Sequence, residues 1–249
     1  MRRICILGVA INALELEQLA ELDGRDMEIW AVNEAFKGLP DGRIPDRIFQ
    51  LHVRNWREAD RSFLYSNGKR LPPSMNRNCF GRNKAHVEYL RTCGVPVYTQ
   101  KAWEDIPTAT VYPFETVQEA VGIPLPPDFK KRLWATSSFG YIGALLLTEH
   151  LKGQRVDEVL VLGCELPMGT QRERLWEWPN FAYYLGMMRG MGIHVILPVS
   201  GTSLLSAPHY ALGGHPKPLE ADHWLYPGNL GIIEDTLDGT WRLGTARLE

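Results

Sequence analysis

Short apolar runs alternate with amphipathic stretches along most of the chain. Four of these runs, Arg3–Leu7, Met27–Val32, Glu158–Leu162 and Ile193–Leu197, have the length and even apolarity of buried strands. The stretches between them carry apolar residues at helical spacing. We therefore expect the four runs to be central, buried strands of one sheet.

The rest of the pattern supplies further strands and the helices that connect them. Strands are expected at Asp46–Leu51, Val95–Tyr98 and Thr110–Pro113, and helices at Ala13–Leu22, Arg54–Phe63, Asn83–Cys93, Phe114–Val121, Thr136–Leu151 and Asn180–Gly192. Such alternation is typical of an α/β fold, here Rossmann-like, with a mainly parallel sheet, helices on both faces and right-handed crossovers. Residues 64–83 and 167–178 lack a sustained apolar period, and we expect them to be the most mobile internal segments.

Two domains follow from this division of the pattern. Residues 1–206 carry the strand and helix signals and are predicted to form one Rossmann-like nucleotide-binding domain. Residues 207–249 are rich in Gly, Pro and aromatic residues. We expect them to form an irregular extension packed on the core.

Composition excludes several classes of function. The net charge of −2 gives no electrostatic case for nucleic acid or an anionic membrane as partner. No apolar window has the length of a membrane span, and the first apolar run stops at Gly8, so it is a strand and not a secretion signal. The four cysteines are scattered and no His/Cys spacing fits a metal, which predicts a cytoplasmic protein with free thiols and no metal site. A homo-oligomer stays open.

Ligands of parallel α/β sheets bind where loops leave the carboxyl ends of the strands. The first strand exits through Gly8 to Asn12, which is not a G-x-G-x-x-G motif. A single glycine still permits close approach to a phosphate or ribose, or it merely ends the strand. The second strand exits at Asn33, where an amide can bond a ribose or a base edge, or cap a helix.

Three hydroxyl residues, Thr136, Ser137 and Ser138, stand at the start of the longest helix signal. A cap needs one hydroxyl, so we expect Ser138 to cap and Ser137 to face a ligand. Gly140, Gly143 and Ala144 then give the helix a small-residue face, which we expect to lie close to the sheet. Gly163 ends another buried strand, and Ser203 belongs to a second hydroxyl cluster after the last strand.

The ordered set of these pieces resembles the single-domain bacterial sialyltransferases that cap lipooligosaccharide, and the related flagellin-glycosylation accessory proteins. The matched pieces are the opening strand with its Gly turn, Val32–Phe36, Asp46–His52, Ala135–Ser138, Leu162–Glu165 and Pro198–Leu205. Uncharacterised phage-encoded proteins carry similar sets, including Gly186–Ile193.

The resemblance implies a cytidine-monophosphate sugar donor. It places Asn33, Thr136, Ser137 and Ser203 along the nucleotide, with Gly8 and Asn12 near the phosphate and Gly163 at the same edge. Two departures stand out. The family's first turn is of a Gly-Asn-Gly-Pro-Ser type, and its catalytic histidine lies in a segment that here, at Pro167–Pro179, has none.

Catalytic residues therefore stay unassigned. His52 at a strand exit is a candidate general base, Arg172 a candidate phosphate ligand, and Glu173 and His209 are further candidates. Two classes of function remain: a glycosyltransferase-like enzyme that uses a nucleotide-activated donor, or a non-catalytic ligand-binding or virion-associated phage protein that keeps the fold without the chemistry. In the second case the location is the host cytoplasm.

Overall fold

A computed structural model of the chain describes residues 1–11, 13–21, 27–39, 43–52, 56–57, 62–63, 84–126, 128–164, 176–197, 233–235 and 241–243. The chain divides into two compact units, Met1–Leu205 and Ser206–Glu249. In the second unit the described residues form an antiparallel pair, β12 (Ile233–Asp235) and β13 (Trp241–Leu243). The first unit contains the sheet.

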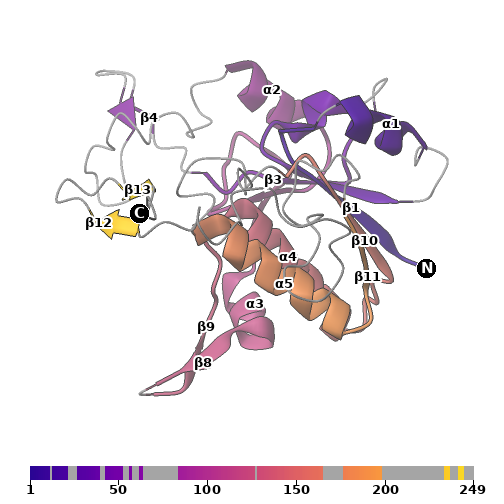
Figure 1. The fold of residues 1–249 in the computed structure, drawn as a ribbon. Coiled ribbons are helices and arrows are strands. Elements are labelled where there is room, and N and C mark those ends of the chain that lie inside the picture. The colour runs from indigo at the N-terminus through magenta and orange to yellow at the C-terminus, as the bar shows by residue number, and fades with distance from the viewer. Residues whose placement is uncertain are drawn as a thin grey trace, which may run out of the picture. The chain divides into compact units, whose positions relative to one another are not determined.

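Among the described residues, seven parallel strands form this sheet in the order β11-β10-β1-β2-β3-β6-β7 (Figure 1). Their bounds are β1 Arg3–Leu7, β2 Glu28–Val32, β3 Arg47–Phe49, β6 Val97–Thr99, β7 Ala109–Val111, β10 Glu158–Leu162 and β11 His194–Ile196. The predicted α/β, Rossmann-like fold class is confirmed, as are β1, β2 and β10 as buried central strands.

Helices cover both faces of the sheet, as Figure 1 shows. They are α1 Ala13–Glu21, α2 Lys84–Thr92, α3 Phe114–Val121, α4 Ser138–Leu151 and α5 Trp178–Gly190, with a short 3-10 helix η1 at Ala35–Gly38. Side chains of a strand alternate between the two faces. Cys5 and Leu7 of β1 accordingly pack with Leu19 of α1, whereas Ile4 and Ile6 pack in the larger core with α3, α4 and α5.

The strand order has one reversal that matters for ligands. From β1 the chain proceeds through β2, β3, β6 and β7 on one side, then returns to the other side of β1 with β10 and β11. The carboxyl ends of β1 and β10 therefore lie at a topological switch point, where sheets of this class bind their ligands.

Three predictions about elements were wrong. The strand β11 is half-exposed and lies at the edge of the sheet, because none of the described strands pairs with its outer side. Within the range predicted as a helix at Arg54–Phe63, the described residues form an antiparallel pair, β4 (Trp56–Arg57) with β5 (Ser62–Phe63). The two glycines of the small-residue face of α4 lie against α5 and not against the sheet, since a Cβ on Gly143 would contact Tyr184 and one on Gly140 would contact Asn180.

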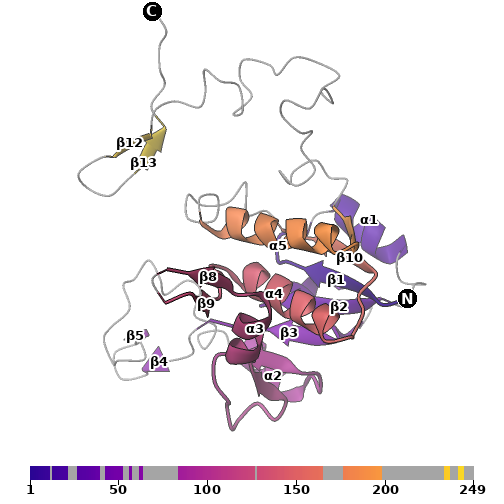
Figure 2. The same cartoon turned by 90° about the horizontal axis from the view of Figure 1, so that it is seen from below.

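The sequence pattern missed a hairpin between α3 and α4. Strands β8 (Ile123–Leu125) and β9 (Lys130–Arg132) pair antiparallel, and Figure 2 shows them beside α3 and α4. Phe129 precedes β9 with a φ of 51°, a left-handed conformation that is costly for a bulky residue. A run so short and so rich in Pro and Lys carries no alternating apolar signal. The segments 64–83 and 167–175, expected to be mobile, lie outside the described residues.

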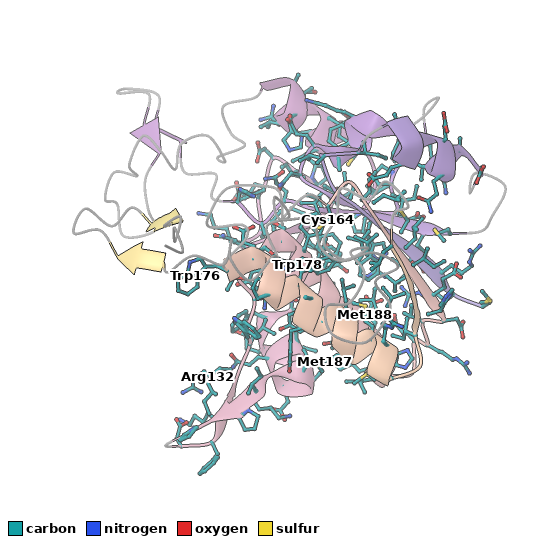
Figure 3. All side chains as sticks on the ribbon, viewed as in Figure 1. Arg132, Cys164, Trp176, Trp178, Met187 and Met188 are labelled. Carbon is teal, nitrogen blue, oxygen red and sulfur yellow. The ribbon has the colours of Figure 1, made fainter. Side chains whose placement is uncertain are left out.

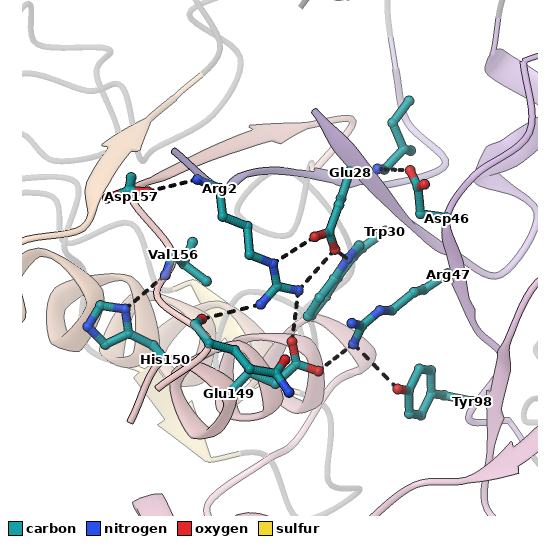
Figure 4. A network of polar contacts seen from close by, with 12 residues as sticks. Arg2, Glu28, Trp30, Asp46, Arg47, Tyr98, Glu149, His150, Val156 and Asp157 are labelled. Carbon is teal, nitrogen blue, oxygen red and sulfur yellow. Dashed lines mark hydrogen bonds and ion pairs between the residues drawn. The ribbon is translucent and has the colours of Figure 1, made fainter. Parts of the chain in front are cut away.

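A network of charged side chains lies at the amino end of the sheet (Figure 4). Arg2 donates to Glu28 at 2.7 Å and to Glu149 of α4 at 2.9 Å, and Arg47 also pairs with Glu149. The guanidinium of Arg47 lies 4.3 Å from the ring centre of Trp30, a cation–π contact. The hydrogen bond from Arg2 lowers the pKa of Glu28. Glu149 thereby links α4 to Arg2, which directly precedes β1, and to Arg47 of β3.

We expect Glu149→Gln to lower the free energy of unfolding by about 1–3 kcal/mol, because two mostly buried guanidiniums lose their shared carboxylate. The matched control is Glu119→Gln, which removes an exposed pair with Lys131 and should change stability by less than about 0.5 kcal/mol. Urea denaturation measures both. Equal effects of the two variants would show that the network contributes no more than a surface ion pair.

Candidate functional site

Two glycines meet at the switch point. The amide of Gly8 donates to the Leu162 carbonyl at 2.8 Å, and the amide of Ala10 donates to the Gly163 carbonyl at 3.1 Å. A Cβ on either Gly8 or Gly163 would overlap the carbonyl oxygen of the other, and Gly163 has a φ of 65°. Each glycine is therefore required by the close approach of the two strand exits, whatever ligand lies nearby.

A buried carboxylate completes this contact. Glu15, in the first turn of α1, is only 3% exposed and accepts the amide hydrogen of Gly163 at 2.8 Å. The amides of Gly8, Ala10 and Gly163 are thus all used within the fold. A phosphate at this turn would face a carboxylate instead of a set of amide donors, so the β1 turn does not suit the pyrophosphate of a dinucleotide.

Asn33 leaves β2 in an unusual conformation. Its φ is 52°, in the left-handed region that Asn tolerates better than most residues, and its amide donates to the Phe49 carbonyl at 3.1 Å. Its side-chain Oδ1 is buried and has no hydrogen-bond partner among the described residues. The next residue, Glu34, occupies the cap position of η1 but makes no side-chain cap bond. The structure therefore gives Asn33 no capping role there, which leaves its buried acceptor unexplained by the fold.

The start of α4 lies at the same edge, because the ring of Phe139 is next to Gly8. The cap of α4 is Ser137, whose Oγ accepts from the Gly140 amide at 3.1 Å, so the expectation that Ser138 caps was wrong. Thr136 donates its hydroxyl to the Trp176 carbonyl at 2.6 Å. Both hydroxyl oxygens thus have structural partners, although the capping hydroxyl of Ser137 retains a proton that it can donate.

Sequence reasoning missed a buried histidine beside this edge. His86 of α2 is 1% exposed, and its Nε2 is 2.8 Å from Oε1 of Gln50, which follows β3. Its Nδ1 is 3.8 Å from Oε1 of Glu34, and Phe36 stacks on its ring. Burial lowers the pKa of His86 to about 4 against the attraction of Glu34, with Lys37 and His52 lowering it further. The available signal was its place on the apolar face of the predicted helix Asn83–Cys93.

The structure thus brings Gly8, Gly163, Asn33 and the start of α4 to one edge of the sheet. His52 is half-buried and follows β3 at that edge. Five candidates lie outside the described residues and stay predictions: Asn12, Arg172, Glu173, Ser203 and His209.

Two further features are absent from the described parts of the chain. No three His, Cys, Asp or Glu residues come together there in a way that would hold a metal ion. None of the helices described is long and apolar enough to cross a bilayer.

Comparison with known proteins adds little. No family model and no curated protein matches the chain. A structural search finds a protein described as "Crystal structure of KRED1-Pglu enzyme", with 9% identity over 86% of this chain and 97% of that chain, and a TM-score of 0.21. At that TM-score the likeness carries no argument about function.

We expect Gly163→Ala to lower the free energy of unfolding by more than 2 kcal/mol, roughly the upper limit of the left-handed penalty alone, because its Cβ also displaces the Gly8 carbonyl. Gly153→Ala is the matched control, since Gly153 has a φ of 90° and open space around its Cβ position. It should show only the backbone penalty of about 1–2 kcal/mol. Denaturant midpoints measure both, and similar losses would contradict the close-approach argument.

His86 should make the protein less stable as the pH falls from about 6.5 to about 4. Its folded pKa is lowered, so the unfolded state binds more protons across that window, and the contribution of up to about 3 kcal/mol at neutral pH is lost. The variant His86→Gln should remove this part of the pH dependence while keeping a polar partner for Gln50. Urea unfolding at several pH values compares the two proteins, and parallel curves would refute the assignment.

Proposed function

We propose that this chain binds a nucleotide or nucleotide sugar at the carboxyl edge of its sheet, and that it acts as a transferase on the activated sugar. The observation that carries the proposal is the buried Oδ1 of Asn33, which has no hydrogen-bond partner among the described residues and belongs to a residue held in a left-handed conformation one strand from the switch point. Strained residues cluster at functional sites, and a buried acceptor without a described partner calls for an explanation such as a bound ligand. A carbonyl oxygen there accepts from a base amino group or a ribose hydroxyl.

The phosphate belongs at the start of α4. Gly140 and Tyr141 use their amides on Ser137, which leaves the amides of Ser138 and Phe139 outside the helix ladder. The helix dipole adds positive potential at this end. The buried carboxylate of Glu15 repels a phosphate from the β1 turn, so the ligand extends from Asn33 toward α4.

The sugar donor is inferred from the resemblance to the lipooligosaccharide sialyltransferases, which favours a cytidine nucleotide. Transfer also requires a base for the acceptor hydroxyl. His52 remains a candidate for that role. His86 stays neutral at pH 7 and has Gln50 as its partner, so we assign it to the scaffold.

One observation favours the second function, a ligand-binding protein without catalysis. The segment Pro167–Pro179, where the family carries its histidine, contains none. A virion-associated phage protein that retains the nucleotide site fits that loss.

A thermal-shift screen over cytidine, uridine, adenosine and guanosine mono- and diphosphates, with CMP- and UDP-sugars, tests the proposal. A ligand at a hundred times its Kd should add about 2.7 kcal/mol to stability. Asn33→Gly removes the amide and suits the left-handed φ, so it should fold normally and weaken nucleotide binding at least tenfold.

The control for that variant is Phe129→Gly, which relaxes the other described non-glycine residue of positive φ, away from the sheet edge. It should leave nucleotide binding unchanged. The proposal fails if no nucleotide stabilises the wild-type protein, or if Asn33→Gly binds as tightly as wild type.

A further inference from the structure

Two exposed tryptophans lie where α4 and α5 begin. Trp134 is 40% exposed and Trp176 is 64% exposed, although most large apolar side chains of this unit are buried. Figure 3 shows Trp176 at the amino-terminal end of α5. A helix that connects parallel strands runs from the carboxyl edge of the sheet back to its amino edge. Both helices therefore begin at the carboxyl edge, since α4 leads into β10 and α5 leads from β10 to β11. Both tryptophans therefore stand close to helix starts at the carboxyl edge, the edge at which the chain leaves β2 through Asn33.

Buried polar groups hold the backbone that carries Trp134. The side chain of Asn180, which is fully buried, donates to the Trp134 carbonyl and accepts from the Thr136 amide at 3.1 Å. The hydroxyl of Tyr184 donates to the same Trp134 carbonyl at 2.7 Å. Gly140 makes room for this arrangement, since a Cβ there would overlap Oδ1 of Asn180.

Trp176 is fixed to the same segment. The hydroxyl of Thr136 donates to its carbonyl at 2.6 Å, so a side chain two residues from Trp134 is bonded to the backbone of Trp176. Tyr183 supports the Trp134 ring, with ring centres 5.4 Å apart. These buried polar contacts fix the positions of two aromatic residues whose side chains stay exposed. Exposed aromatic side chains in fixed positions are typical of a binding surface.

We propose that Trp134 and Trp176 form a carbohydrate-binding surface for the acceptor of the transfer, a proposal that rests on the proposed function only in naming the sugar as the acceptor. The apolar C–H face of a pyranose is slightly positive and stacks on the negative face of an indole. The hydroxyls around the ring need donors and acceptors, which the hydroxyls of Ser138 and Thr136, close to Trp134 in the chain, can offer; Thr136 offers only its oxygen, since its proton is donated to the Trp176 carbonyl. The rigid backbone lowers the entropic cost of binding a neutral, weakly held sugar.

The test is ¹⁹F NMR of protein labelled with 5-fluorotryptophan, titrated with maltotriose, cellotriose and chitotriose. The chain has eight tryptophans, and Trp134→Phe and Trp176→Phe assign the two resonances of interest. At least one trisaccharide should shift both. The resonances of Trp30 and Trp103, both buried, should not move.

Variants then quantify the contribution of each indole. Trp176→Ala and Trp134→Ala should each weaken trisaccharide binding at least fivefold and leave nucleotide stabilisation unchanged. Phe129→Ala removes an exposed aromatic side chain elsewhere and should change neither. If Trp134→Ala does not fold, Trp176→Ala alone decides, because its exposed ring supports nothing that the structure describes.

The inference is overturned if no trisaccharide shifts either resonance, or if a soluble nitroxide fails to broaden them, which would mean that protein covers the surface. Nucleotide binding without trisaccharide binding overturns this inference and leaves the proposed function intact. Trisaccharide binding without nucleotide binding does the reverse, and the surface then stands as a sugar site by itself.

Discussion

The backbone contact between Gly8 and Gly163 sets the geometry of the whole carboxyl edge. The two strand exits approach closely enough to exchange hydrogen bonds, and any side chain at either position would separate them. This approach lets Glu15 reach the Gly163 amide and brings Phe139, in the first turn of α4, next to Gly8. The relative positions of β1, β10, α1 and α4 thus depend on one contact that excludes side chains.

The polar groups at the two ends of the sheet have different kinds of partner. At the amino end, Arg2, Arg47, Glu28 and Glu149 neutralise one another, and Trp30 lies against the guanidiniums. At the carboxyl end, the exits of β1 and β10 satisfy their own amides, while the Asn33 side chain has no described partner for a buried acceptor. A fold can tolerate few such acceptors, since each costs about 1–3 kcal/mol. The ligand is assigned to the carboxyl end because Asn33 combines such an acceptor with a left-handed conformation at a strand exit.

The hydroxyl groups at the start of α4 have structural roles and can still take part in ligand binding. Ser137 caps the helix and Thr136 ties α4 to α5, so both have structural roles before any ligand arrives. Ser137 accepts in its cap and can still donate to a phosphate, whereas Thr136 donates its only proton to the Trp176 carbonyl and can only accept, for example from a sugar hydroxyl. The same hydrogen bonds fix Trp134 and Trp176, so the architecture of α4 and α5 also positions the exposed aromatic surface.

The sequence by itself determined the fold class and most elements, because buried strands such as Glu158–Leu162 and helices such as Phe114–Val121 have apolar periods that local geometry imposes. It also placed Gly8, Gly163 and Asn33 at strand exits. Only the tertiary structure decided that β11 is an edge strand, that Gly140 and Gly143 face α5, and that His86 is buried against Gln50. Those facts depend on which elements become neighbours, and a periodic pattern shows that a face is covered without showing what covers it.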